Sequence, residues 1–222
     1  MQDNQDQHMK PQAILFDWDN TLADTWPTIY EALSHTFQKM GRTPWTLEET
    51  KERVHRSLRD SFPAIFGQDW EKAGELYLTT FKAIHLDKLS VIDGAEEMLK
   101  ALSKTDIYRA VVSNKTGYNL RAEVTHLGWD KYFHKTIGAK DAPRDKPSPD
   151  PVYMALEGSH IIPSKKVWFI GDSVTDLECA HNSDCLPILY GEHTMEDKRF
   201  SHCKPSFHVP DHHVLKNMIE KF

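Results

Sequence analysis

The sequence predicts an α/β protein in which a parallel β-sheet carries an inserted, all-helical domain. Two observations lead to this fold class. Over most of the chain, short apolar runs alternate with stretches of helical pattern, which is typical of a parallel sheet covered by helices on both faces, in a Rossmann-like arrangement. Residues 25–89 break this rhythm, because they contain helical patterns only.

The expected strands and helices follow from apolar periodicity and from residues that begin or end helices. The expected strands are 13–16, 107–112, 135–138, 167–170 and 186–189. The expected helices outside the insert are 94–103, 118–127, 151–157, 174–182 and 214–221. Gly128 suits a left-handed helix stop, and Asp150 with Pro151 suits a helix start.

The insert contains its own residues that begin and end helices. A first helix opens at Thr25-Trp26-Pro27 and stops at Gly41. Thr46 begins a second helix with capping-box spacing, and a third begins near Asp69. We therefore divide the chain into a polar, disordered tail (1–12), a core domain (13–24 and 90–222) and a helical cap domain (25–89). The cap follows the first strand directly, so we expect it to act as a lid over the strand ends.

Composition excludes several classes of function. The formal charge is 27 − 33 = −6, which disfavours nucleic acid as a partner because phosphate-backbone binding needs clustered Lys and Arg. No apolar stretch approaches the roughly 20 residues that span a bilayer, and the N-terminus lacks the apolar region of a secretory signal. The odd number of cysteines (Cys179, Cys185 and Cys203) favours reduced thiols. We expect a cytoplasmic protein, either a monomer or a weak homodimer.

Two carboxylates at the end of the first strand are the most informative local feature. Asp17 and Asp19 directly follow the apolar run 13–16. Alternation along an extended backbone directs residues i and i+2 to the same side, so the two carboxylates would share one space. Each would raise the pKa of the other unless a cation or a shared proton intervened. The pair therefore suggests a divalent metal, acid–base chemistry, or both.

Other polar groups follow the remaining strands. Ser113-Asn114 follows the second expected strand, Lys146 lies in the loop after the third, and Asp172 and Asp176 follow the fourth. In a parallel sheet such groups meet at one edge. Hard carboxylate oxygens suit Mg²⁺, and a lysine with a hydroxyl suits phosphoryl oxygens. Together these residues predict a magnesium-dependent phosphate site.

Taken in order, these residues resemble the haloacid dehalogenase-like (HAD) superfamily. Its four motifs correspond here to Asp17-Trp18-Asp19-Asn20-Thr21, Ser113-Asn114, Lys146-Pro147 and Gly171-Asp172 with Asp176. The similarity spans residues 14–189, and the insert has the size and place of the helical C1 cap of that family. The long loop of the third motif and the Asp24-Thr25 step look most like the phosphoglycolate phosphatase branch.

The resemblance implies a Mg²⁺-dependent phosphomonoesterase that hydrolyses a small, phosphoglycolate-like phosphorylated metabolite. Asp17 would be the nucleophile that forms an aspartyl-phosphate, and Asp19 the general acid and base. The resemblance assigns the metal to Asp17, Asp19 (through its backbone carbonyl), Asp172 and Asp176. It assigns the substrate phosphate to Ser113, Lys146 and, through its backbone amide, Asn114. Asp19 argues against dehalogenase or phosphonatase chemistry, because those members lack an Asp at this position.

Some positions depart from the family or leave alternatives open. Asn20 replaces a usual Gly, but Asn tolerates left-handed dihedrals, so we expect the turn to be retained. Arg56 and Arg59 could determine substrate specificity or form a solvated helix face. The C-terminal histidines match no standard zinc spacing and are expected to be scattered over the surface. The cluster that invites a zinc interpretation comprises His193, His202, Cys203, His208, His212 and His213.

Two other functions remain open at this stage. A phosphomutase of the β-phosphoglucomutase type would share every catalytic residue, and Arg56 or Arg59 could then bind its second phosphate. A catalytically silent binding protein could keep the fold, although the intact Asp17, Asp19, Lys146 and Asp172 argue against it.

Overall fold

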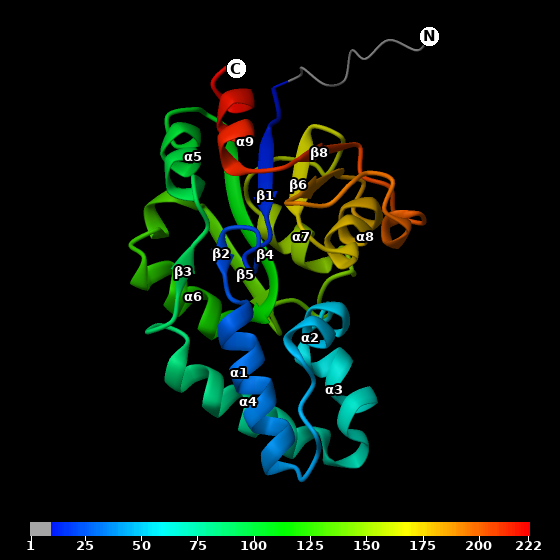
Figure 1. Ribbon diagram of the computed structural model, residues 1–222. Helices are drawn as coiled ribbons and strands as arrows, with labels where there is room; N and C mark the ends of the chain where they lie inside the picture. The colour runs from blue at the N-terminus through cyan, green and yellow to red at the C-terminus, as the bar shows by residue number, and fades with distance from the viewer. Residues whose placement is uncertain (1–9) are drawn as a thin grey trace.

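The computed structural model describes residues 10–222 and contains a six-stranded parallel sheet (Figure 1). Its order is β5-β4-β1-β6-β7-β8, and each neighbouring pair is parallel. The strands are β1 (Ala13–Phe16), β4 (Tyr108–Thr116), β5 (Lys135–Ala139), β6 (Val167–Gly171), β7 (Leu186–Tyr190) and β8 (Phe207–Val209). The predicted α/β class with a parallel sheet is confirmed.

Helices cover both faces of this sheet (Figure 1). One face carries α5 (Ala95–Leu102), α6 (Gly117–His126) and α9 (His212–Ile219), and the other carries α7 (Asp150–Leu156) and α8 (Val174–Asn182). Along β1, Ile14 and Phe16 join the apolar cluster of the first face, whereas Ala13 and Leu15 join that of the second. Burial on both sides explains why the strand is apolar at every position.

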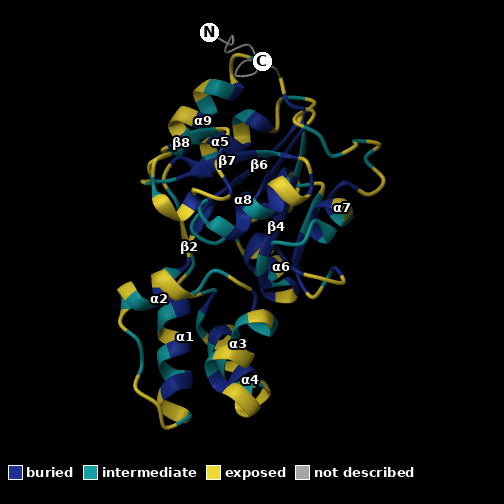
Figure 2. Cartoon of the chain, turned by 90° about the vertical axis from the view of Figure 1, so that its right-hand side faces the viewer, coloured by how far each residue is buried: buried dark blue, intermediate teal, exposed yellow. Residues whose placement is uncertain are grey.

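The helical insert consists of α1 (Trp26–Lys39), α2 (Leu47–Arg53), α3 (Leu58–Phe66) and α4 (Trp70–Ile84), with a short 3₁₀ turn, η2 (Gly67–Asp69). It lies beyond the carboxyl edge of the sheet and has buried residues of its own (Figure 2). These are Leu33, Phe37, Phe62, Phe66 and Ala73. Antiparallel pairing of β2 (Ala23–Asp24) with β3 (Ser90–Val91) joins the two ends of the insert.

Sheet order determines where a ligand can bind. From β1 the chain passes to β4 and β5 on one side, then crosses back to β6, β7 and β8 on the other. The order therefore reverses beside β1, and open α/β sheets bind ligands at such a point, outside the carboxyl ends of the strands. Asp17 is the first residue after β1.

Several elements differ from the sequence-based prediction. Strand β4 continues to Thr116, with a register shift between Val112 and Thr116, so Ser113 and Asn114 lie within the strand and not after it. Strands β2, β3 and β8 and helix α3 were not predicted. Two further 3₁₀ turns, η3 (Asp130–Tyr132) and η4 (Lys198–Phe200), complete the structure.

The predicted tail falls largely outside the described residues. Residues 10–12, its last part, are joined to the sheet: the Gln12 amide donates to the Lys166 carbonyl at 2.8 Å, and the Gln12 carbonyl accepts from the Tyr108 amide at 3.0 Å. The predicted tail is therefore wrong at Gln12, whose backbone is hydrogen-bonded beside the start of β1. Cys179, Cys185 and Cys203 are buried free thiols. Within residues 10–222, no helix combines the length and apolarity that crossing a bilayer requires.

Candidate active site

A cavity of about 410 Å³ lies between the carboxyl edge of the sheet and the helical insert. The core contributes Asp17, Asp19, Ser113 and Asp172 to its lining, and the insert contributes residues such as Arg56. The cavity therefore brings residues from both parts of the chain to the end of β1.

The turn after β1 aims the two carboxylates. Asn20 adopts a left-handed φ of 59°, which confirms the expectation for this position. Its amide donates to the Ala23 carbonyl at 2.7 Å, and its side-chain oxygen accepts from the Thr25 amide at 3.4 Å. Asn thus supplies the turn conformation that a Gly would otherwise provide.

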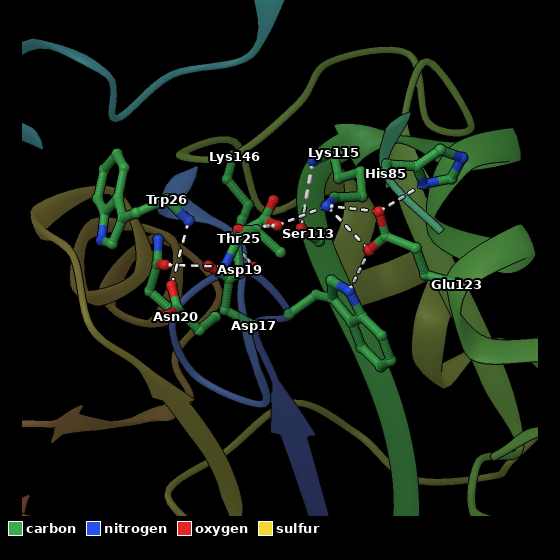
Figure 3. Close-up of polar contacts among 12 residues, drawn as sticks. Asp17, Asp19, Asn20, Thr25, Trp26, His85, Ser113, Lys115, Glu123 and Lys146 are labelled. Carbon is green, nitrogen blue, oxygen red and sulfur yellow. Dashed lines mark hydrogen bonds and ion pairs between the residues drawn. The ribbon is translucent and has the colours of Figure 1, made fainter. Parts of the chain in front are cut away.

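Asp17 is 7 % exposed and lies beside a buried lysine (Figure 3). Lys146 Nζ is 2.8 Å from Asp17 Oδ1 and 2.6 Å from Asp176 Oδ1. The contact with Asp17 lacks hydrogen-bond geometry, so this buried Oδ1 has no hydrogen-bond donor within residues 10–222. Although burial opposes the charge of Lys146, Asp17 and Asp176 raise its pKa above the usual range.

Asp17, Asp172 and Asp176 form an acidic group whose oxygens lie within 4.8 Å of one another. Burial and the charge of Asp176 raise the pKa of Asp17 to about 7, with a smaller contribution from Asp19, while Lys146 opposes the shift. Burial, Asp176 and Asp17 also raise the pKa of Asp172. Crowded, buried carboxylates with an oxygen that lacks a donor fit a divalent cation with a preference for hard oxygen ligands. The side chain of Asp19 is not part of this group.

Asp176 has protein donors on both oxygens. Oδ1 accepts from Lys146, and Oδ2 accepts from the Ser173 amide at 3.0 Å and the Ser173 hydroxyl at 2.6 Å. Ser173 and Asp176 form a capping box at the start of α8. Asp176 therefore positions Lys146 and closes the acidic group from behind.

The predicted phosphate-binding residues lie close together. Ser113 is buried and its hydroxyl accepts from the Lys115 amide at 3.2 Å. Asn114 Nδ2 donates to the Lys146 carbonyl at 3.1 Å, so this side chain links β4 to the loop that carries the lysine. Both residues line the cavity, whereas Lys146 lies behind Asp17. Contacts of these residues with a phosphate remain a prediction from the sequence.

A buried network next to Asp19 was not predicted from the sequence (Figure 3). Lys115 Nζ lies 2.6 Å from Asp19 Oδ1 and also contacts Glu123, which accepts hydrogen bonds from Trp18 and contacts His85. Lys115 stands two residues after Ser113, so strand alternation would have placed both side chains on the same side. This two-residue spacing from Ser113 is the sequence signal that could have identified Lys115 as a site residue.

The two arginines proposed for the cap have different surroundings. Arg56 lines the cavity. Arg59 instead forms a two-pronged pair with Asp145, through Nε and Nη2 at 2.6 Å each, in the loop just before Lys146. Its guanidinium therefore ties α3 to the core.

The histidine prediction was partly wrong. His202 and His213 are exposed and pair with Glu178 and Asp93. His193 lines the cavity, and His212 is fully buried, with Nε2 2.7 Å from the Thr21 carbonyl. The apolar surroundings of α9 bury His212, which spacing alone does not reveal. Within residues 10–222 the histidines join no metal-type group.

Known proteins are similar to this chain in sequence and in fold. Residues 14–188 match the family model for haloacid dehalogenase-like hydrolases. A phosphoglycolate phosphatase of Pseudomonas fluorescens is 29% identical over 194 residues, covering 82% of this chain and 70% of the relative. A pyrophosphatase of Listeria monocytogenes is 28% identical over 178 residues, covering 80% and 82%.

Solved structures agree with these sequence similarities. A HAD-superfamily hydrolase from Ehrlichia chaffeensis is 33% identical with a TM-score of 0.65, covering 96% of this chain and 98% of the other. A haloacid dehalogenase-like hydrolase from Streptococcus pneumoniae shares the fold with a TM-score of 0.80 at 20% identity, covering 95% and 98%. The chain therefore belongs to the haloacid dehalogenase-like hydrolase family and, by its curated relatives, to the phosphoglycolate phosphatase-like branch.

Proposed function

We propose that this enzyme is a Mg²⁺-dependent phosphomonoesterase that acts on a small phosphorylated metabolite through an aspartyl-phosphate on Asp17. One observation carries the proposal. Asp17 stands at the reversal point of the sheet, in the cavity, with Lys146 Nζ at 2.8 Å and the carboxylates of Asp172 and Asp176 close by. A nucleophilic carboxylate next to a fixed cation and a divalent-metal site suits phosphoryl transfer.

The residues divide the chemistry between them. An oxygen of Asp17 attacks phosphorus while the bond from phosphorus to the alcohol oxygen breaks, and Asp19 gives that oxygen a proton. Asp19 then takes a proton from the water that hydrolyses the aspartyl-phosphate. Lys146 offsets the charge of Asp17, and Ser113 with the Asn114 amide holds phosphoryl oxygens.

Asp17, Asp172 and the backbone carbonyl of Asp19 would hold Mg²⁺, with Asp176 beside them. When bound, the ion would neutralise charge on the phosphoryl group and on these carboxylates. This assignment is supported by the crowding of Asp17, Asp172 and Asp176, which offer carboxylate oxygens within 4.8 Å of one another.

The cavity favours a substrate that carries a second anionic group. Basic side chains from both parts of the chain line it: Lys51, Arg53, Arg56 and Arg199. We assign residues 25–89 as a cap that selects the substrate, over a core formed by 13–24 and 90–222. Phosphoglycolate, whose carboxylate lies near its phosphate, is the first candidate. Inorganic pyrophosphate is the second, because it also pairs two anionic groups and a similar protein is named a pyrophosphatase.

Phosphate release from a panel of phosphorylated metabolites and pyrophosphate tests this function. We expect release that requires Mg²⁺, stops with EDTA and is abolished in Asp17→Asn. Asp106→Asn is the matched control, since Asp106 is exposed and its ion pair within residues 10–222 is with Lys10. Isomerisation without phosphate release would favour a mutase. A wild-type protein inactive on the whole panel, or an Asp17→Asn variant that keeps its activity, would overturn the proposal.

A further inference from the structure

Lys115 is a buried cation beside the proposed acid–base residue (Figure 3). Its side chain is 4% exposed, and Nζ lies 2.6 Å from Asp19 Oδ1 and 3.0 and 2.9 Å from the two carboxylate oxygens of Glu123. The ring of Phe81 lies on another side, 4.8 Å from Nζ. The ammonium donates hydrogen bonds to both Glu123 oxygens, and Asp19 Oδ1 is its second ion-pair partner. Lys115 is therefore fixed by the protein.

Glu123 is held from two further directions. The Trp18 indole Nε1 donates to Oε2 at 2.6 Å, and His85 Nδ1 lies 2.7 Å from Oε1. Trp18 stands between Asp17 and Asp19 in the chain, and His85 follows α4, the last helix of the insert. A fully buried carboxylate is costly unless it is paired and hydrogen-bonded, and these contacts meet that need.

These contacts hold Asp19 by one oxygen. Oδ1 lies 2.6 Å from Lys115 Nζ in an ion pair and accepts a hydrogen bond from the Thr25 hydroxyl at 2.6 Å. Within residues 10–222 the side-chain hydrogen bond to Asp19 is made to Oδ1 and none is made to Oδ2, and Asp19 lines the cavity. The network thus restrains the carboxylate and leaves one oxygen for proton exchange.

We propose that Lys115 is a positioning residue for proton transfer by Asp19, with Glu123 as the counter-ion that holds Lys115 in place. The proposal rests on the proposed function. The proton moves from Asp19 Oδ2 to the ester oxygen as the bond from phosphorus to that oxygen breaks and the bond from Asp17 to phosphorus forms. A carboxylate free to rotate would spend less time in the orientation for this transfer.

Two esters with different leaving groups test the role. An alkyl phosphate needs a proton on its leaving oxygen, whereas p-nitrophenyl phosphate releases a stable anion. For Lys115→Met, which keeps the length of the side chain and removes its charge, we expect kcat/KM to fall about 100-fold on the alkyl ester. On the aryl ester we expect the fall to be at least tenfold smaller. A purely structural role would lower both values by the same factor.

A control, an alternative variant and a double variant complete the test of the Lys115 role. Lys100→Met is the matched control, because Lys100 is exposed on α5 and, among the described residues, forms an ion pair with Glu96. Trp18→Phe removes the indole donor from Glu123, keeps an aromatic ring in the core, and should give a smaller selective loss on the alkyl ester if Lys115→Met fails to fold. The Lys115→Met/Glu123→Gln double variant should be no worse than Lys115→Met.

Equal losses on both esters in a folded Lys115→Met or Trp18→Phe protein would overturn the positioning role. Failure of the proposed function looks different, since the wild-type enzyme would then hydrolyse neither ester or Asp17→Asn would remain active.

Discussion

At the residue scale, the tightest steric constraint in the site is Gly171, the last residue of β6. A Cβ at this position would lie 2.4 Å from the Cβ of Asp176, well inside van der Waals contact. We expect Gly171→Ala to displace Asp176, lower the free energy of unfolding by about 1–3 kcal/mol and reduce phosphatase activity. Urea unfolding and kcat/KM measure the two effects.

Gly74→Ala on α4 is the matched control for that substitution. Its new Cβ would meet only the end of the Leu58 side chain, at 3.1 Å, and Ala favours a helix over Gly by up to about 1 kcal/mol. We expect little change in stability or activity. Equal stability losses in the two variants would show that Gly171 has no special steric role.

Sequence alone could place the motif residues but not all of their partners. Asp17, Asp172 and Lys146 were predictable because their types and their positions after apolar runs already imply one chemistry. The pairing of Lys115 with Glu123 was not predictable, because Glu123 lies on α6 and only the packing of that helix against β4 brings the two residues together. The role of Arg59 was left undecided for the same reason, since its partner Asp145 is 86 positions away in the sequence.

At the scale of elements, Arg59 connects α3 to the loop that carries Lys146. The Asp145 side chain is 1% exposed and also accepts from the Lys140 amide at 2.9 Å. Removing Arg59 would leave this buried carboxylate without its cation. We expect Arg59→Ala to cost about 1–3 kcal/mol of unfolding free energy and to raise KM, since the insert would be held less firmly over the site.

Arg144→Ala tests whether the position of Arg59 matters. Arg144 pairs with Asp150, but its side chain is 71% exposed, and exposed pairs contribute about 0–1 kcal/mol. We expect its thermal unfolding and KM to stay near those of the wild type. An Arg59→Ala protein that also matches the wild type in both measurements would argue against the connection.

Helices and strands were predictable where they are long or where capping residues mark their ends. The Thr46 capping box and the helix start after Thr25 are present in the structure. Strands β2, β3 and β8 are two or three residues long, too short for an apolar pattern. Helix α3 contains Pro63, which usually signals an end and not an interior. These elements depend on tertiary contacts for their definition.

At the scale of the whole molecule, His212 joins the C-terminal helix to the first motif through the Thr21 carbonyl. Burial lowers the pKa of His212 from 6.5 to about 4, while Asp211, Asp93 and the Thr21 carbonyl oppose the shift and His213 adds to it. The unfolded chain therefore binds a proton between about pH 6.5 and 4 that the folded chain does not. Stability is lost as pH falls through this window, by up to about 3 kcal/mol.

Urea unfolding of the wild type and His212→Gln at pH 7 and pH 4.5 tests this linkage. The variant should be less stable at pH 7, because a buried contact is lost, but should lose less stability on acidification. His126→Gln is the control, since His126 is an exposed histidine on α6. If His212→Gln and the wild type lose the same stability between the two pH values, His212 does not carry the effect.

The arrangement of the molecule as a whole followed from the alternation of strands and helices and from the helical segment after the first strand. The strand order, with its reversal beside β1, did not, because apolar runs do not specify which strands are neighbours. The cavity between insert and sheet also depends on this order.

The most direct test of the account is the transfer of phosphate to Asp17. In Asp19→Asn mixed with p-nitrophenyl phosphate and Mg²⁺, the first transfer needs no acid, whereas hydrolysis of the aspartyl-phosphate loses its base. We therefore expect a rapid burst of one p-nitrophenolate per enzyme, followed by slow turnover, with phosphate found by mass spectrometry on the peptide that contains Asp17. Release without a burst, or phosphate on any other residue, would contradict the central claim.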